Sequence, residues 1–110
     1  MTGRRHTVVW TEVALRDVER LAAYLVDESP LRAEQILGRI IDRGESLASA
    51  PGRGHVPAEL RALGDRTWLQ VLESPWRIVY RVVGKRVEIH AVLDGRRSLE
   101  DILLERILNA

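Results

Sequence analysis

W-R-I-V-Y-R-V-V-G-K-R-V-E-I-H-A-V, residues 76–92, decides the fold of this chain. Two runs rich in β-branched residues flank Gly84-Lys85, which is the pattern of an antiparallel β-hairpin with a two-residue turn. Successive side chains of a strand alternate between its two faces, so the first run is expected to place arginines on one face and apolar residues on the other. The arginine face would carry Arg77, Val79 and Arg81, and the apolar face Ile78, Tyr80 and Val82.

The turn also predicts which residues of the two strands lie opposite each other. With Gly84-Lys85 as the turn, Arg81 is expected opposite Glu88 and Arg77 opposite Val92. A cross-strand ion pair of Arg81 with Glu88 would stabilise the hairpin by only some tenths of a kcal/mol. Arg77 has no acid across the strand in this register and is therefore the stronger candidate for a functional role.

Composition describes an ordinary water-soluble domain. The chain has 110 residues, of which 45% are hydrophobic and 30% charged, and it has no cysteine. These values predict a single domain over residues 1–110 and exclude a disulfide framework and thiolate chemistry. No apolar run approaches the roughly 18 residues of a membrane span, and residues 1–6 lack the apolar core of a signal peptide. We therefore expect a cytoplasmic protein that does not enter a membrane.

The net charge of +1 hides an uneven distribution along the chain. Residues 1–50 carry seven arginines against eight acids, whereas residues 51–97 carry nine basic residues against five acids, and residues 98–110 one arginine against three acids. Sixteen of the seventeen basic residues are arginine, the side chain suited to two-pronged contact with phosphate or carboxylate. A coding bias toward arginine is the alternative explanation.

The first half of the chain predicts one strand and two helices. A short β-branched run at 6–10 favours a strand, and apolar residues at helical spacing favour a helix over 12–27. Ser29-Pro30 is a typical helix start, and the second helix is expected to run to about residue 49. Because two or three residues separate the helices, they are expected to form an αα-hairpin.

The second half predicts a sheet. Residues 50–57 form the single Pro/Gly-rich loop, and 58–63 are undecided between a helical turn and coil. Strands are expected at 67–73, 76–83 and 86–94, followed by a helix over 99–109 capped by Ser98. The order β-α-α-β-β-β-α predicts the α+β class, with a helical hairpin packed on one face of a small antiparallel sheet and the first strand beside a later one.

Further candidate residues are basic. Arg96-Arg97 follow the last predicted strand in a tight turn, and two alternatives are open for them: they are simply solvated, or they bind a carboxylate or phosphate with Arg66 as a third member. Arg53 and His55 are mobile candidates in the Pro/Gly-rich loop, and for both a role without function is favoured. The three histidines lack the spacing of a metal site, and no serine, histidine and aspartate form an arguable triad, so neither a metal nor a cofactor is expected.

Taken in order, five segments resemble the RelE/ParE superfamily of toxins from bacterial toxin–antitoxin pairs. They span nearly the whole chain at the family spacing. The segments are W-T-E-V-A-L-R-D-V-E-R-L-A-A-Y-L at 10–25, S-P-L-R-A at 29–33, V-P-A-E-L at 56–60, W-R-I-V-Y-R-V at 76–82 and I-H-A-V-L-D-G-R-R-S-L at 89–99.

The resemblance implies one of two activities. RelE-like members cleave mRNA in the ribosomal A site with arginine, lysine and, in some, a C-terminal tyrosine, whereas ParE-like members poison DNA gyrase. Arg77 and Arg97 match the conserved basic positions, but Trp68 and Gln70 stand where the nucleases carry lysines, and Leu103 stands near the tyrosine position. Arginine stays protonated and is a poor general acid or base, so these replacements favour the ParE-like role.

The expected function is therefore a ParE-like gyrase inhibitor that a cognate antitoxin neutralises in a hetero-oligomer. Its target-binding residues would be Arg66, Arg77, Arg96 and Arg97. The alternative is a ribosome-dependent endoribonuclease whose Arg77, Arg81 and Arg97 hold the scissile phosphate. A second alternative is a toxin-fold protein without activity that only binds its antitoxin.

Overall fold

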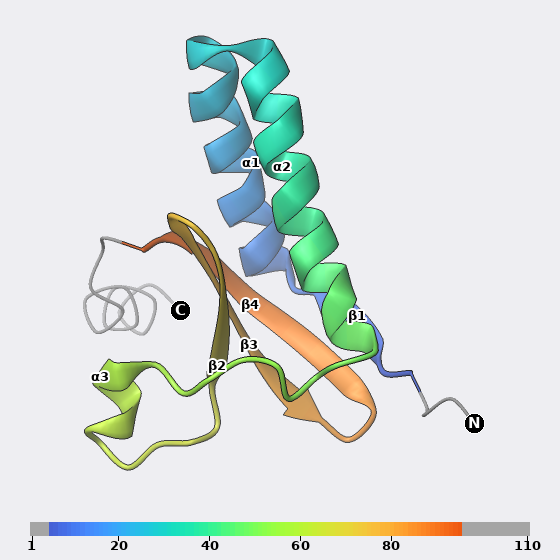
Figure 1. The fold of residues 1–110 in the computed structure, drawn as a ribbon, viewed down its shortest axis with the longest axis vertical. Coiled ribbons are helices and arrows are strands. Elements are labelled where there is room, and N and C mark those ends of the chain that lie inside the picture. The colour runs from blue at the N-terminus through green and yellow to red at the C-terminus, as the bar shows by residue number, and fades with distance from the viewer. Residues whose placement is uncertain (1–4, 96–110) are drawn as a thin grey trace.

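The computed structural model describes residues 5–95, so the predicted C-terminal helix over 99–109 lies outside the described part of the chain. Figure 1 shows a helical hairpin standing on a twisted sheet. The elements in chain order are β1 (Thr7–Trp10), α1 (Glu12–Glu28), α2 (Pro30–Glu45), the short 3₁₀ helix η1 (Ser46–Ala48), α3 (Ala58–Arg61), β2 (Leu69–Glu73), β3 (Trp76–Val83) and β4 (Arg86–Asp94).

The sheet has four strands in the order β1-β4-β3-β2. Strands β2, β3 and β4 are antiparallel as predicted, but β1 pairs with β4 in parallel, so the whole sheet is mixed. The helical hairpin explains the parallel pair. It returns the chain to the start of β1, where the His6 N–H donates to the Ala48 carbonyl. From there β2, β3 and β4 alternate in direction, so the third of them, β4, runs the same way as β1.

Side-chain caps set the helix boundaries that the sequence predicted. The hydroxyl of Thr11 accepts a hydrogen bond from the Ala14 N–H at the start of α1. Ser29 ends α1 and caps α2, with Pro30 at the first helical position, where its missing N–H costs nothing. The second helix ends at Glu45, earlier than predicted, because the chain tightens into η1.

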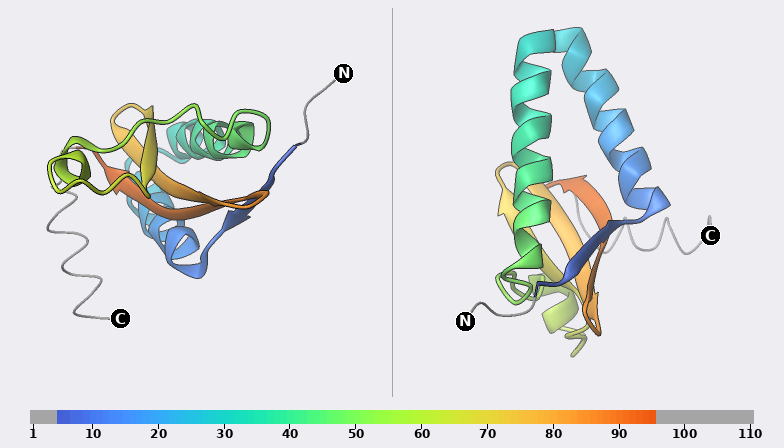
Figure 2. Two further views of the ribbon diagram at one scale, coloured as in Figure 1. Left: turned by 90° about the horizontal axis from the view of Figure 1, so that it is seen from below. Right: turned by 90° about the vertical axis from the view of Figure 1, so that its right-hand side faces the viewer.

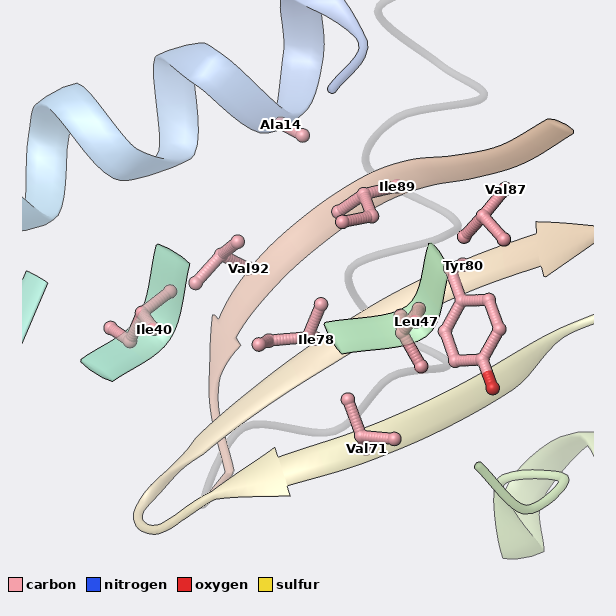
Figure 3. Packing of buried hydrophobic residues seen from close by; sticks show 9 residues of the cluster. All are labelled: Ala14, Ile40, Leu47, Val71, Ile78, Tyr80, Val87, Ile89 and Val92. Carbon is pink, nitrogen blue, oxygen red and sulfur yellow. The ribbon is translucent and has the colours of Figure 1, made fainter. Parts of the chain in front are cut away.

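The main core lies between the helical hairpin and one face of the sheet (Figure 3). Both helices cover this same face, and the turn between them projects past the end of the sheet (Figure 2). The buried residues of this core are Ala14, Ile40, Leu47, Val71, Ile78, Tyr80, Val87, Ile89 and Val92. Trp10 seals its edge against Gly44, where a Cβ would come within 2.5 Å of the indole ring.

Behind the sheet lies a second, smaller apolar cluster. We call the side of the sheet opposite α1 and α2 the second face. Leu60 of α3 packs there against Val79, Ala91 and Leu93, and α3 lies well apart from the helical hairpin (Figure 1). The segment that carries α3 thus folds back over part of the second face.

A register shift in the β3–β4 pair changes the neighbours of Arg77. Gly84, with a φ of 60°, makes the predicted turn, and Arg81 lies opposite Glu88 as predicted. Between Val79 and Tyr80 the register then shifts by one residue, so Arg77 lies opposite Leu93 and not Val92. The prediction assumed a regular ladder and missed this β-bulge, which adds one residue to β4.

Candidate functional site

The second face carries the candidate functional residues. Alternation along the strands places on it the charged and aromatic side chains that the core face excludes. By register and contacts, these residues are Trp68, Gln70, Leu72, Arg77, Val79, Arg81, Glu88, His90, Ala91 and Leu93.

Arg77 forms a two-pronged ion pair with Glu59 of α3. Its Nη1 and Nη2 atoms donate to the Glu59 Oε2 and Oε1 atoms at 3.1 and 3.0 Å. Only 11% of the Arg77 side chain and 27% of the Glu59 side chain are exposed. Parallel hydrogen bonds between a guanidinium and a carboxylate are among the stronger polar contacts in proteins. Arg77 is therefore held in one orientation.

The sequence predicted no acid across the strand from Arg77, and Leu72 and Leu93 indeed lie opposite it, but Arg77 has an acidic partner from outside the sheet. The acid comes from α3, 18 residues earlier in the chain, and not from the neighbouring strand. Leu60 anchors α3 in the second-face cluster, and the buried Pro57 precedes the helix. Strand register alone could not find Glu59, because its position depends on the path of a loop.

Glu88 gathers three positively charged or ionisable groups at the other end of this face. It accepts a hydrogen bond from Arg81 Nε at 2.8 Å and two from Arg86 at 2.9 and 2.6 Å, and its Oε1 lies 3.1 Å from His90 Nε2. The hydrogen bond with His90, followed by those from Arg81 and Arg86, lowers the pKa of Glu88 to about 2. Glu88 is thus a carboxylate at any ordinary pH.

Trp68 joins this Glu88 cluster through its ring. The imidazole of His90 meets the indole edge-on, with 5.0 Å between centroids and 84° between planes. The guanidinium of Arg81 lies 5.4 Å from the indole centroid, within the range of a cation–π contact. The 40% exposure of Arg81 shows how much more open this end is than the Arg77 end.

Gln70 is a buried polar residue beneath the loop that precedes α3. Its Nε2 lies 3.3 Å from His55 Nε2, and His55 also forms a backbone bridge with Gln70. Within residues 5–95, the Gln70 Oε1 atom has no hydrogen-bond partner. Trp68 and Gln70, which the resemblance aligned with the lysines of the RelE-like nucleases, are thus held in contacts within the protein, and neither supplies a charge.

The other predicted site residues are dispersed. Arg66 is exposed in the loop before β2, and Arg53 donates to the Ser46 hydroxyl at 2.8 Å. Arg96 and Arg97, together with Leu103, lie outside the described residues. The structure thus brings Arg77 and Arg81 to one face as predicted, but it gives each its own carboxylate. Glu59 is the site residue that the sequence did not reveal.

Tyr80 lies on the core face of β3 and does not join the candidate functional residues of the second face. The hydroxyl of Tyr80 points to the loop after η1, where it donates to the Pro51 carbonyl at 2.7 Å and accepts from the Gly54 N–H. Burial raises the pKa of this hydroxyl, which opposes a role as a base. Across residues 5–95, no three histidines or acids are placed to hold a metal ion, and no helix there is long and apolar enough to cross a membrane.

A family model matches residues 8–99, which is most of the chain. The family is described as the ParE toxin of type II toxin-antitoxin system, parDE. This chain belongs to that family. The match confirms the resemblance to the RelE/ParE superfamily and makes the protein a toxin of the type II class.

Two relatives are toxins by name. Toxin RelE2 of Caulobacter vibrioides is 34% identical over 91 residues, which cover 82% of this chain and 96% of the relative. The candidate toxin Y4kP of Sinorhizobium fredii is 27% identical over 99 residues, which cover 90% of this chain and 98% of the relative.

Solved structures share the fold. A chain from the chromosomal ParDE TA system of P. aeruginosa superposes with a TM-score of 0.68 at 22% identity, covering 84% of this chain and 98% of that chain. A chain from the toxin–antitoxin complex RelBE2 of Mycobacterium tuberculosis gives a TM-score of 0.58 at 23% identity, covering 82% and 98%. The predicted helical hairpin on a small sheet is thereby confirmed as the superfamily fold.

Proposed function

We propose that this toxin inhibits DNA gyrase by binding it and does not cleave RNA. The observation that carries the proposal is the pairing of Arg77 with Glu59, which leaves the conserved basic position of the strand neutralised. Cleavage of a phosphodiester needs groups that move protons and stabilise charge on the phosphate. Trp68 and Gln70 supply neither, and the single lysine of the chain, Lys85, lies in the β3–β4 turn.

Four arginines are the proposed target-binding residues: Arg66, Arg77, Arg96 and Arg97. In this role the protein acts in the cytoplasm. Arg66 is exposed and can contact an acidic surface directly. Arg77 would act indirectly, because its guanidinium holds Glu59 and so fixes the position of α3.

A supercoiling assay with purified gyrase tests the proposal. We expect the toxin to inhibit supercoiling and to accumulate cleaved DNA, and we expect the Arg66→Glu variant to be weaker while equally stable. The Arg32→Glu variant, with an exposed arginine on α2 replaced, is the matched control for the change in charge. Unchanged supercoiling at a stoichiometric excess of toxin would remove gyrase as the target.

The second candidate function is ribosome-dependent cleavage of mRNA by Arg77, Arg81 and Arg97. The 34% identity to toxin RelE2 is the observation in its favour. Toeprinting on translating ribosomes separates the two candidates, since a nuclease gives new 3′ ends within the A-site codon. If neither assay responds and overproduction is harmless, the protein is a toxin fold that only binds its antitoxin.

A cognate antitoxin is the proposed partner in all three cases. The helical hairpin exposes large apolar side chains that an amphipathic antitoxin segment can cover, among them Tyr24, with 61% exposed, and Leu31, with 66% exposed. The excess of arginine in residues 51–97 suits an acidic segment. Leu31→Glu is expected to weaken the toxin–antitoxin complex without lowering stability, which calorimetry of the purified pair would measure.

A further inference from the structure

We propose that Glu59 is a specificity residue that occupies an anion site at Arg77 and keeps phosphate out of it. The site is defined by the two Nη atoms of Arg77, which point to α3 and to both oxygens of one carboxylate. A guanidinium fork fits a carboxylate and a phosphate by the same two parallel hydrogen bonds. Glu59 therefore stands where two oxygens of a phosphate would bind.

The surroundings of the Arg77 guanidinium accommodate one anion, and they make a paired anion necessary. Arg77 lies in a cross-strand row between Leu72 and Leu93, and Leu93 itself packs with Leu60 in the second-face cluster. An arginine with 11% exposure among leucines has lost most of its hydration, so a paired anion is needed to offset that loss. A phosphate approaching the same fork would meet the charge of Glu59 at close range and be repelled.

The carboxylate is held firmly enough to exclude a competitor. Leu60, the next residue, is buried, and the Arg61 Nη2 atom donates to the Val56 carbonyl at 3.1 Å. Both contacts hold α3 in place over the second face. The inference goes beyond inhibition of gyrase because it concerns phosphate alone, and its test does not involve gyrase.

The test is removal of Glu59 in the full-length protein. Inorganic phosphate is titrated into wild type and E59A at constant ionic strength, with chloride as the reference salt, and the shift of the unfolding midpoint gives the apparent dissociation constant. We expect E59A to bind phosphate at least about tenfold more tightly than wild type, and a short oligoribonucleotide to follow the same order in fluorescence anisotropy. The double variant E59A/R77Q is expected to lose this gain in phosphate affinity.

The matched control is E73A, which removes one negative charge elsewhere on the surface. Glu73 lies 3.8 Å from Arg39 Nε and 3.5 Å from Arg43 Nε, without the two-pronged geometry of the Arg77 pair. An equal gain in E73A, or no gain in E59A, overturns the proposal.

Folding of E59A does not limit the test. If E59A is unfolded in chloride, we expect phosphate to refold it. The milder E59Q keeps the size of the side chain and is titrated in parallel. Failure of phosphate to refold E59A, together with no phosphate binding by folded E59Q, overturns the proposal as well.

Discussion

On the face covered by α1 and α2, strand β3 contributes Ile78 and Tyr80, both fully buried, whereas on the second face it contributes Arg77 and Arg81, each paired with a carboxylate. The first face is stabilised by apolar burial, which needs shape and volume but no specific partner. The second face depends on individual polar pairs. Substitutions on the two faces should therefore differ in kind as well as in size.

The largest effect is expected on the core face. Ile78→Ala removes a buried side chain from the centre of the main core and leaves a cavity, so the free energy of unfolding should fall by about 3 kcal/mol. Val82→Ala is the control on the same strand, because Val82 is exposed and should change stability by less than ~1 kcal/mol. Urea unfolding measures the stability of both variants. Equal losses of stability would contradict the distinction between the buried Ile78 and the exposed Val82.

Arg77→Gln should have the next largest effect and separates the two arginines of the second face. The change leaves Glu59 without its two charge-assisted hydrogen bonds, and we expect a loss of about 2 kcal/mol, less than for a fully buried pair because 27% of the Glu59 side chain is exposed. Arg81→Gln is the control: Arg81 is more exposed and should lose less than ~1 kcal/mol. The reverse order, measured by urea unfolding, would place the stronger pair at the open end of the face.

Tyr80→Phe tests the polar end of a core residue. Removing the hydroxyl leaves the Pro51 carbonyl and the Gly54 N–H without that partner, so stability should fall by about 1 kcal/mol. Amide hydrogen exchange should also quicken at Gly54, whose N–H this hydroxyl holds. Tyr24→Phe, on the exposed side of α1, is the control and should behave as wild type. An unaltered exchange rate at Gly54 would show that the loop does not need Tyr80.

The smallest effect concerns the acid stability of the Glu88 cluster. The pKa of Glu88 is about 2 in the folded protein against an ordinary value of 4.5, so the Glu88 carboxylate stabilises the fold at pH values above about 4.5. This contribution is lost as the pH falls from about 4.5 toward 2. The difference in urea midpoint between wild type and Glu88→Gln should shrink over that window, and a constant difference would contradict the lowered pKa.

Local patterns were sufficient for most of the fold. Ser29-Pro30 marked the start of a helix, Gly84-Lys85 marked a turn, and both signals act within a few residues. The pairing of Arg81 with Glu88 followed from the turn because only two residues separate each partner from it.

Features that depend on distant contacts were not predictable. The bulge in β4 shifts Arg77 by one place, and its position reflects packing on both faces at once. Glu59 reaches Arg77 because Leu60 packs α3 against the sheet, and the segment around α3 carries no periodic pattern that would predict this contact. The parallel direction of β1 likewise follows from the return path of the helical hairpin.

Because the turn of the helical hairpin projects past the sheet, the length of the two helices can change in evolution independently of the sheet. Because the hairpin rises past the end of the sheet (Figures 1 and 2), whole helical turns of about 3.6 residues can be added to both helices without moving the strands. The reach of the molecule is therefore adjustable independently of its second face. The helical hairpin can in this way become longer or shorter while the Arg77–Glu59 and Arg81–Glu88 pairs keep their positions.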